Sequence, residues 1–296
     1  MISRRPFTQT QGFRIALKVV YIVLCVAAAV ICLFPFLALL ITVTKTSKEI
    51  KAGFSFSIGF SFFDNVQKLI EFMDMRGYSL IISFINSVII SFVSTAVCVY
   101  FSALTAYACH VYDFKGKAFF EKFILLLIII PGQLGSVGFY RLVQEIYRIA
   151  PVVRETYLCY SIFILPAIAS ASTVFFLKQY LKNNFSKDYV DAARMDGASE
   201  FRIFNTICLP FIKSALATMA LFGIIASWNN FMGPLIFIQN SSLYTLPLLI
   251  FNIASTQNVD LGVYYTATLL SMLPTVVVYF ALHKFIIKGT SAGGIK

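Results

Sequence analysis

Charged residues are scarce in this chain. Only 12% of its 296 residues are Asp, Glu, Lys or Arg, and 59% are hydrophobic. A soluble globular domain is typically about 25% charged and about half apolar. The scarcity of charge therefore excludes an ordinary soluble domain and predicts an all-α polytopic membrane protein, surrounded by the lipid bilayer.

The sequence also lacks the residue sets that carry enzyme chemistry. There are two histidines, no CxxC pair, no Cys/His cluster and no GxxxxGK[ST] phosphate-binding loop. The six cysteines are scattered, mostly within apolar runs, and are expected to be small buried side chains rather than disulfides or metal ligands. We predict no catalytic residue and no metal site, and therefore no enzyme.

Two further classes are disfavoured by the distribution of charge. The net charge of +11 could indicate nucleic acid, but in a membrane chain it is better explained by basic cytoplasmic loops, so we predict no nucleic-acid partner. Most apolar runs contain no Asp or Glu. Ion-coupled carriers usually bury such groups, so their absence counts against a secondary transporter.

Gaps between charges predict six membrane spans, since a spanning helix needs about 20 mostly apolar residues. A cleaved signal peptide is the alternative for the first run, but that run is longer than a signal-peptide core. Pro131 is expected to kink or stop the third helix. The predicted spans are roughly 17–43, 81–109, 118 to about 135, 157–178, 210 to about 234, and 262–284.

The basic residues orient these spans. Sixteen of the 24 Lys and Arg residues fall on the side that holds both termini, whereas the acids divide almost evenly. By the positive-inside rule, the N- and C-termini are predicted to be cytoplasmic. The chain is expected to consist of a cytoplasmic N-terminus (1–16), a permease domain (17–288) and a cytoplasmic tail (289–296). Within the permease domain, segments 44–80 and 235–261 are expected outside and the loop 183–209 in the cytoplasm.

The cytoplasmic loop contains the polar stretch DAARMDGASEFRIFNTICLP, residues 191–210. Ser186 can cap a helix, and Gly197 can adopt the left-handed conformation that ends one. Ser199 offers a second cap, after which Phe201, Phe204 and Ile207 are available to pack. The spacing predicts a helix-turn-helix along the cytoplasmic face. An amphipathic interfacial loop remains the alternative on physical grounds alone.

This stretch resembles the EAA loop of ATP-binding-cassette importer permeases. That pattern is EAA, three residues, Gly, nine residues, Ile, one residue, Leu-Pro. The departure is Asp at position 191, where the family has Glu; the charge is kept and the reach is shorter. The positions of the pattern are occupied by Asp191, Ala192, Ala193, Gly197, Ile207, Leu209 and Pro210.

Two other segments extend the resemblance, specifically to carbohydrate permeases of the maltose type. SWNNFMGPLIFI (227–238) is similar to their WN-x-F-x-x-P-L segment, and the ending GTSAGGIK is similar to their C-terminal tail. The resemblance implies a type I importer permease fold in the bacterial plasma membrane. It also implies that Gly293 and Gly294 belong to a tail that contacts the ATPase; a disordered end is the alternative.

In this family the EAA loop docks in a cleft on an ATPase subunit, whose ATP-driven closure switches the spans from inward to outward opening. By position, Ala192, Ala193 and Gly197 would allow close docking, and Asp191 and Arg194 would make polar contacts. The chain itself would bind no cofactor, with ATP and Mg held by partner subunits. The implied partners are a second, different permease, two nucleotide-binding ATPase subunits and an extracellular solute-binding protein.

Three residues near the outer end of the fifth span are candidates for the substrate pathway. Trp228, Asn229 and Asn230 combine an aromatic ring with amides, which suits a sugar. Trp228 as an interface anchor is the alternative.

The sequence supports a permease subunit of a carbohydrate importer, with three competing functions. The nearest is a permease of the same superfamily for another solute, such as a polyol, glycerol phosphate or peptide. A stand-alone channel or carrier would function without an ATPase. An intramembrane enzyme would need acids, histidines or a nucleophile in the spans, which this sequence lacks.

Overall fold

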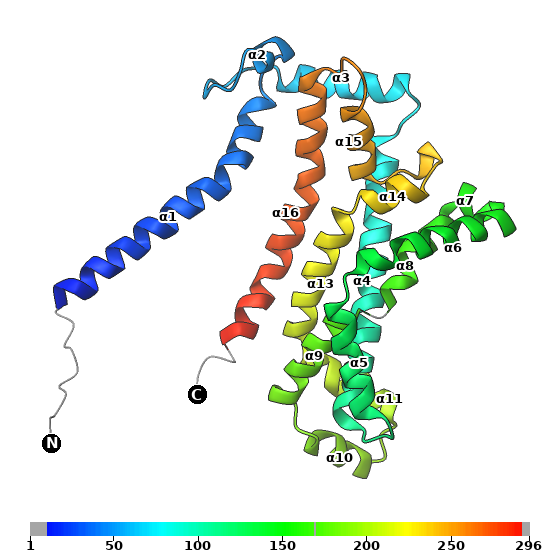
Figure 1. The fold of residues 1–296 in the computed structure, drawn as a ribbon. Helices are drawn as coiled ribbons and strands as arrows, with labels where there is room; N and C mark the ends of the chain where they lie inside the picture. The colour runs from blue at the N-terminus through cyan, green and yellow to red at the C-terminus, as the bar shows by residue number, and fades with distance from the viewer. Residues whose placement is uncertain (1–10, 169, 292–296) are drawn as a thin grey trace. The chain divides into compact units, whose positions relative to one another are not determined.

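The computed structural model describes the backbone of residues 11–168 and 170–291. Within these ranges the secondary structure is helical and contains no strand (Figure 1), which confirms the predicted all-α class. The tail glycines Gly293 and Gly294 lie outside the described residues. The chain divides into two units, one formed by residues 1–71 and 258–269 and the other by residues 72–257 and 270–296.

The first unit begins with a long apolar helix, α1 (Gln11–Thr42). No part of its most apolar stretch is buried within the chain. A helix that is apolar on all sides and unburied is typical of a membrane span. The expected burial of Cys25 and Cys32 is therefore wrong, because both lie exposed on this helix, and all six cysteines are free thiols.

The segment after α1 is folded. It contains α2 (Ser47–Lys51) and the first part of α3 (Phe62–Met75). The buried Asn65 side chain donates to the carbonyl oxygens of Val43 and Lys45, both at 2.9 Å. Asp260, just before α16 (Leu261–Ser291), accepts a 2.5 Å hydrogen bond from Ser47. These bonds give the predicted outer segment a defined structure.

The second unit is built around α4 (Leu80–Val111), against which α9 (Ala171–Asn184) and α13 (Lys213–Trp228) pack. Figure 1 shows these three helices running side by side. The other helices of this unit are α5 (Lys117–Ile129), α6 (Ser136–Ile149), α7 (Pro151–Glu155), α8 (Ser161–Ile164), α10 (Asp188–Met195), α11 (Glu200–Ile203), α12 (Leu209–Phe211), α14 (Met232–Phe237) and α15 (Leu246–Ala254), and the unit also includes α16 from Leu270 onward.

Three described helices are long and apolar enough to cross a membrane, and two bent helix pairs raise the number to five. The single helices are Leu17–Thr42, Leu80–Val111 and Leu261–His283, which match the first, second and sixth predicted spans. The third predicted span differs. Its helix α5 stops at Ile129, before Pro131 as expected, and its 13 residues extend only about 20 Å.

The fifth predicted span begins later than expected. Pro210 lies in the short helix α12, and the chain then bends by 80° before α13. At the bend Ile212 has φ −95° and ψ 15°, outside the helical region, so the straight helix begins at Lys213. Hydropathy does not reveal this break, because Pro210 fits the first turn of the predicted span, where proline is tolerated, and the apolar run continues after Lys213.

The predicted outer loop 235–261 is largely folded onto the second unit. It contains α15, whose Leu248, Leu249 and Ile253 side chains are buried. The Asn86 side chain of α4 donates to the carbonyl oxygens of Ser242 and Tyr244, both at 3.1 Å. These long-range hydrogen bonds, which sequence spacing does not reveal, hold the segment against α4.

Candidate functional site

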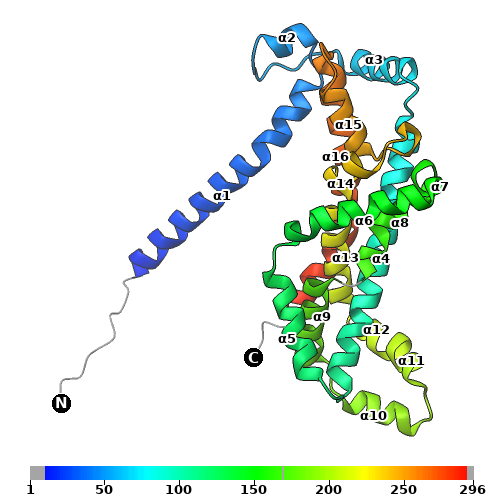
Figure 2. The same cartoon turned by 45° about the vertical axis from the view of Figure 1, so that its right-hand side comes forward.

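The EAA-like stretch forms a helical hairpin of α10 and α11 at one end of the second unit. Figure 2 shows this hairpin beside the C-terminal end of α4, at the opposite end from α15. The predicted helix-turn-helix is therefore present. Its first helix begins where the Ser186 hydroxyl accepts a 3.2 Å hydrogen bond from the amide of Asp188.

The turn between the two helices is a Schellman motif. The amide of Ala198 donates to the carbonyl of Ala193, and the amide of Gly197 donates to that of Arg194, both at 3.0 Å. Gly197 has φ +76°, in the left-handed region that disfavours side chains. The predicted role of Gly197 as the residue that ends the first helix is confirmed.

One face of α10 is turned inward. Val190 is fully buried and Ala193 nearly so, in a core cluster that includes Leu177 and Leu181 of α9 and Phe204. The two alanines of the EAA-like motif therefore differ: Ala193 fixes the hairpin to the spanning helices, while Ala192 is exposed. The inner face of the hairpin is therefore packed in one core cluster with side chains of α4 and α9.

In the second arm of the hairpin, only two of the three apolar residues that were expected to pack do so. Phe204 is buried and Ile207 packs against the same cluster, but Phe201 is 65% exposed. Ser199 occupies the N-cap position of α11 without a side-chain capping bond. The chain passes through a π-helical turn, Phe204–Cys208, and reaches Leu209 and Pro210 in α12.

Arg194 joins the two arms of the hairpin. Its guanidinium donates to Glu200 at 2.7 Å and to Asp191 at 3.0 Å, and it lies 5.9 Å from the centre of the Tyr112 ring. The hydrogen bond to Glu200, followed by that to Asp191, raises the pKa of Arg194. The Tyr112 hydroxyl donates to the other oxygen of Glu200 at 2.5 Å, which connects the hairpin to the end of α4.

The outer face of the hairpin is open. Asp191, Ala192 and Gly197 are exposed, and Met195 is 88% exposed. A Cβ placed on Gly197 would meet no other atom within 4 Å. The hairpin thus presents a narrow surface of small side chains with one projecting methionine, which another protein can approach closely.

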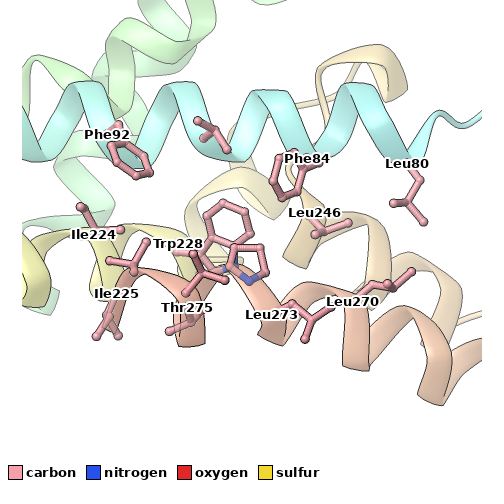
Figure 3. Close-up of a pocket in the computed structure, with 14 residues that line it drawn as sticks. Leu80, Phe84, Phe92, Ile224, Ile225, Trp228, Leu246, Leu270, Leu273 and Thr275 are labelled. Atoms are coloured by element: carbon pink, nitrogen blue, oxygen red, sulfur yellow. The ribbon is translucent and has the colours of Figure 1, made fainter. Parts of the chain in front are cut away.

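Trp228 lies deep in the second unit, at the end of α13. Its indole NH donates to the carbonyl of Ser271 at 3.1 Å, and its ring packs edge-on against Phe84. Figure 3 shows Trp228 among apolar side chains of α4, α13, α15 and α16 that line a cavity of about 500 Å³. Because the indole is 4% exposed and bonded internally, the interface-anchor alternative is not supported.

Trp228 also borders a second cavity, of about 400 Å³, with a more polar lining. We call it the hydroxyl-bearing cavity. The Ser94 and Ser227 hydroxyls meet there at 3.1 Å. Within the described residues, the hydroxyls of Thr95 and Thr245 are buried and have no hydrogen-bond partner. Unpaired buried hydroxyls are costly, so a water or a solute that reached them would gain hydrogen bonds.

The two predicted asparagines are placed differently. Asn230 lines the hydroxyl-bearing cavity, and its side-chain oxygen accepts a 3.1 Å hydrogen bond from the amide of Gly233. Asn229 is exposed, and its amide donates to the carbonyl of Ile225 on its own helix. Of the predicted pathway residues, Trp228 and Asn230 line the same cavity and Asn229 does not.

Sequence reasoning missed the contribution of α4 to this cavity. Ser87, Ser94 and Thr95 are buried and line it, together with Cys98 of the same helix. Residues four apart share one helix face. This spacing of small polar residues within an apolar run was the signal that could have identified the face. Among the described residues, no group of three or more His, Cys, Asp or Glu side chains could hold a metal ion.

Comparison with known proteins agrees with this architecture. The profile of the family "Binding-protein-dependent transport system inner membrane component" matches residues 14–291. The arabinooligosaccharides transport system permease protein AraQ of Bacillus subtilis is 30% identical over 300 residues, covering 100% of both chains. The lactose transport system permease protein LacG of Rhizobium radiobacter is 30% identical over 262 residues, covering 88% of this chain and 90% of LacG.

A third relative and a solved structure extend the comparison. The melibiose/raffinose/stachyose import permease protein MelC of Bacillus subtilis is 31% identical over 282 residues, covering 94% of this chain and 98% of MelC. A chain from the crystal structure of a bacterial ABC transporter involved in the import of the acidic polysaccharide alginate has a TM-score of 0.77 and 19% identity, covering 95% of this chain and 99% of that chain. This likeness shows a shared fold.

Proposed function

Because the chain belongs to the family of binding-protein-dependent transport system inner membrane components, we propose that it is a permease subunit of an ATP-driven carbohydrate importer. Members of this family are membrane transport subunits and not enzymes. The relatives AraQ, LacG and MelC are named for oligosaccharide or disaccharide transport, which supports a carbohydrate as the solute.

The observation that carries the coupling role is the α10–α11 hairpin. It combines an inner face packed into the spanning helices with an outer face of small exposed side chains at Ala192 and Gly197. In the proposed complex this outer face docks on one of two nucleotide-binding subunits, which bind ATP and Mg. Closure of those subunits displaces the hairpin, and the packing of Val190 and Ala193 passes the displacement to α9 and α4.

The hydroxyl-bearing cavity is our candidate for this chain's part of the solute pathway. Its lining contains no Lys, Arg, Asp or Glu and includes the rings of Phe139, Phe163 and Trp228. Aromatic faces with scattered hydroxyls and an amide, here Asn230, suit a neutral sugar. An acidic or phosphorylated solute would instead call for cationic side chains.

The remaining assignments complete the proposed assembly. The chain contributes half of the translocation pathway beside a second, different permease, and an extracellular solute-binding protein delivers the sugar. Both termini face the cytoplasm, as the basic residues indicate. The permease domain extends over 17–288 with six spans, the third formed by the short helix α5 and the residues that follow it; segments 44–80 and 235–261 face outward.

Solute uptake tests this function. In a strain that lacks only this chain, we expect ATP-dependent uptake of one or more of arabinotriose, lactose, melibiose and raffinose to be lost and to return when the chain is restored. If uptake of every sugar in the panel continues without the chain, the carbohydrate assignment is wrong. If the restored chain supports uptake after ATP depletion, the importer mechanism is wrong.

A further inference from the structure

The connection between α2 and α3 exposes a dense set of aromatic rings. Residues 52–63, AGFSFSIGFSFF, contain no charge, although Lys51 and Asp64 flank them. Phe60 is 98% exposed, and large parts of Phe56, Ile58 and Phe63 are also exposed. We call residues 53–61 the aromatic loop. A contiguous exposed apolar patch of this kind indicates an interaction surface.

The aromatic loop lies against α1. The rings of Phe54 and Phe56 pack edge-on against Phe34, with centroid distances of 5.7 and 6.5 Å, and against each other at 5.0 Å. This cluster is no closed core, because all three rings remain about half exposed or more. Phe34 itself belongs to the unburied apolar surface of α1.

The length of α1 places this cluster at membrane depth. The span Leu17–Thr42 has 26 residues and is about 39 Å long, about 9 Å longer than the hydrocarbon core. Phe34 lies about 12 Å along the helix axis from Thr42. Even if all of the excess length projects beyond this end, Phe34 remains about 3 Å inside the hydrocarbon. The rings that touch Phe34 therefore reach the boundary between acyl chains and headgroups.

Several backbone groups of the loop have partners within the chain. The amides of Gly59 and Ser61 donate to the hydroxyl and the carbonyl of Thr44, at 2.9 and 2.8 Å. The buried Lys45 ammonium donates to the carbonyl and hydroxyl oxygens of Ser55. Irregular backbone is excluded from the hydrocarbon core, whereas at the boundary with the headgroups the other polar groups of the loop can bond to water. The bonds to Thr44 and Lys45 fix the loop beside the end of α1.

We propose that the aromatic loop is a membrane-interface anchor that inserts Phe54, Phe56 and Phe60 among the lipids of the leaflet in which α1 ends. A soluble protein that docks and leaves in each transport cycle would return these rings to water each time, at a large hydrophobic cost. The bilayer covers them continuously. The uncharged sequence between Lys51 and Asp64 fits this partner, since both charges remain at its edges.

Photocrosslinking in native membranes tests the anchor without requiring transport. Benzoylphenylalanine replaces Phe56 or Phe60 in the full chain, the cells are irradiated, and the digested peptides are weighed by mass spectrometry. We expect phospholipid adducts at both positions. The matched control is Phe201, exposed on the α10–α11 hairpin, where we expect no lipid adduct. Crosslinks to protein alone, or no lipid adduct at either loop position, would overturn the proposal.

A second variant tests how the loop is seated. A Cβ on Gly59 would collide with the backbone carbonyl of Thr44. G59A should therefore displace the loop from α1 and lower the yield of lipid adduct at Phe56 several-fold. An unchanged yield would contradict the proposed seating on Thr44. Because no step depends on the solute, the outcome is independent of the carbohydrate assignment.

Discussion

The guanidinium of Arg194 donates a 2.7 Å hydrogen bond to the carboxylate of Glu200, across the turn that Gly197 makes between α10 and α11. Glu200 also accepts from the hydroxyl of Tyr112, which directly follows α4. Arg194 was expected to contact a partner protein. In the folded chain it braces the hairpin from within, and this internal role leads to the first prediction.

Neutralising Glu200 should weaken transport more than stability. Arg194 and Glu200 are both partly exposed, so loss of the pair should have little effect on folding stability. Without this ion pair, the hairpin would deform when the ATPase subunit moves it and would transmit less motion to the spanning helices. We therefore expect uptake by E200Q to fall about fivefold, the factor that corresponds to about 1 kcal/mol. The measurement is sugar moved per ATP hydrolysed in reconstituted vesicles.

Two further variants make this test specific. The exchange of charges in R194E/E200R should restore most of the uptake lost in E200Q. R202Q is the matched control, since no ion pair of Arg202 occurs in the described part of the chain and it is exposed on the same arm. Equal losses in E200Q and R202Q would contradict the bracing role.

Side chains at Gly197 should block coupling. G197D places a side chain in the left-handed conformation and projects a carboxylate from the open outer face. We expect membrane insertion to be retained and uptake to be abolished. Gly116 provides the control, because it has φ +89° and equally open surroundings but lies outside the hairpin. Normal uptake by G197D, or an equal loss in G116D, would refute docking at Gly197.

Removing the unpaired hydroxyl of Thr95 should weaken solute binding during uptake and leave folding stability unchanged. T95V replaces this hydroxyl by a methyl group, which keeps the shape of the side chain and removes a buried donor that has no partner. The melting temperature should therefore be unchanged or slightly higher. If sugar hydroxyls meet Thr95 in the cavity, the KM for uptake should rise. T266V is the control, since Thr266 is also buried and unpaired but does not line this cavity. The same change of KM in both variants would contradict a role of Thr95 in the solute pathway.

The Asp113 carboxylate should give stability a defined pH dependence. Hydrogen bonding and charge from Lys117, whose ammonium lies 2.9 Å away, with a weaker effect from Lys187, lower the pKa of Asp113 below 3.8. Because the folded pKa is the lower one, the stabilisation is complete above the unfolded pKa of about 3.9 and is lost as the pH falls through the folded value. The difference in melting temperature between wild type and D113N should be constant from about pH 8 to pH 6 and shrink below pH 4. A difference that grows on acidification would contradict the pairing.

Local chemistry made the hairpin predictable from sequence. Gly197 and the small polar residues around it specify a Schellman turn through backbone conformation alone, and the structure contains that turn. The long apolar helices follow equally from hydropathy. In contrast, the break at Ile212 and the folding of α15 onto α4 depend on contacts between distant residues, such as Asn86 with Ser242. Periodicity and composition carry no information on such pairs.

The candidate site shows the same division. The spacing of the EAA-like motif placed Asp191, Ala192 and Gly197 correctly on the exposed face, but it could not show that Ala193 faces inward. The hydrogen bonds of Arg194 within the hairpin could not be inferred from the sequence either. Each of these features depends on which side of α10 meets α9 and the Phe204 turn, and that is decided by packing in three dimensions.

The most direct test of whether this chain is part of an ATP-driven importer is its purification, with a tag, from the native host in mild detergent, followed by mass spectrometry of the proteins that accompany it. We predict that a second permease of similar size and a nucleotide-binding subunit co-purify in fixed proportion. For G197D, we predict less of the nucleotide-binding subunit and an unchanged amount of the second permease. Recovery of this chain alone, stable and able to move solute into vesicles without ATP, would contradict the account.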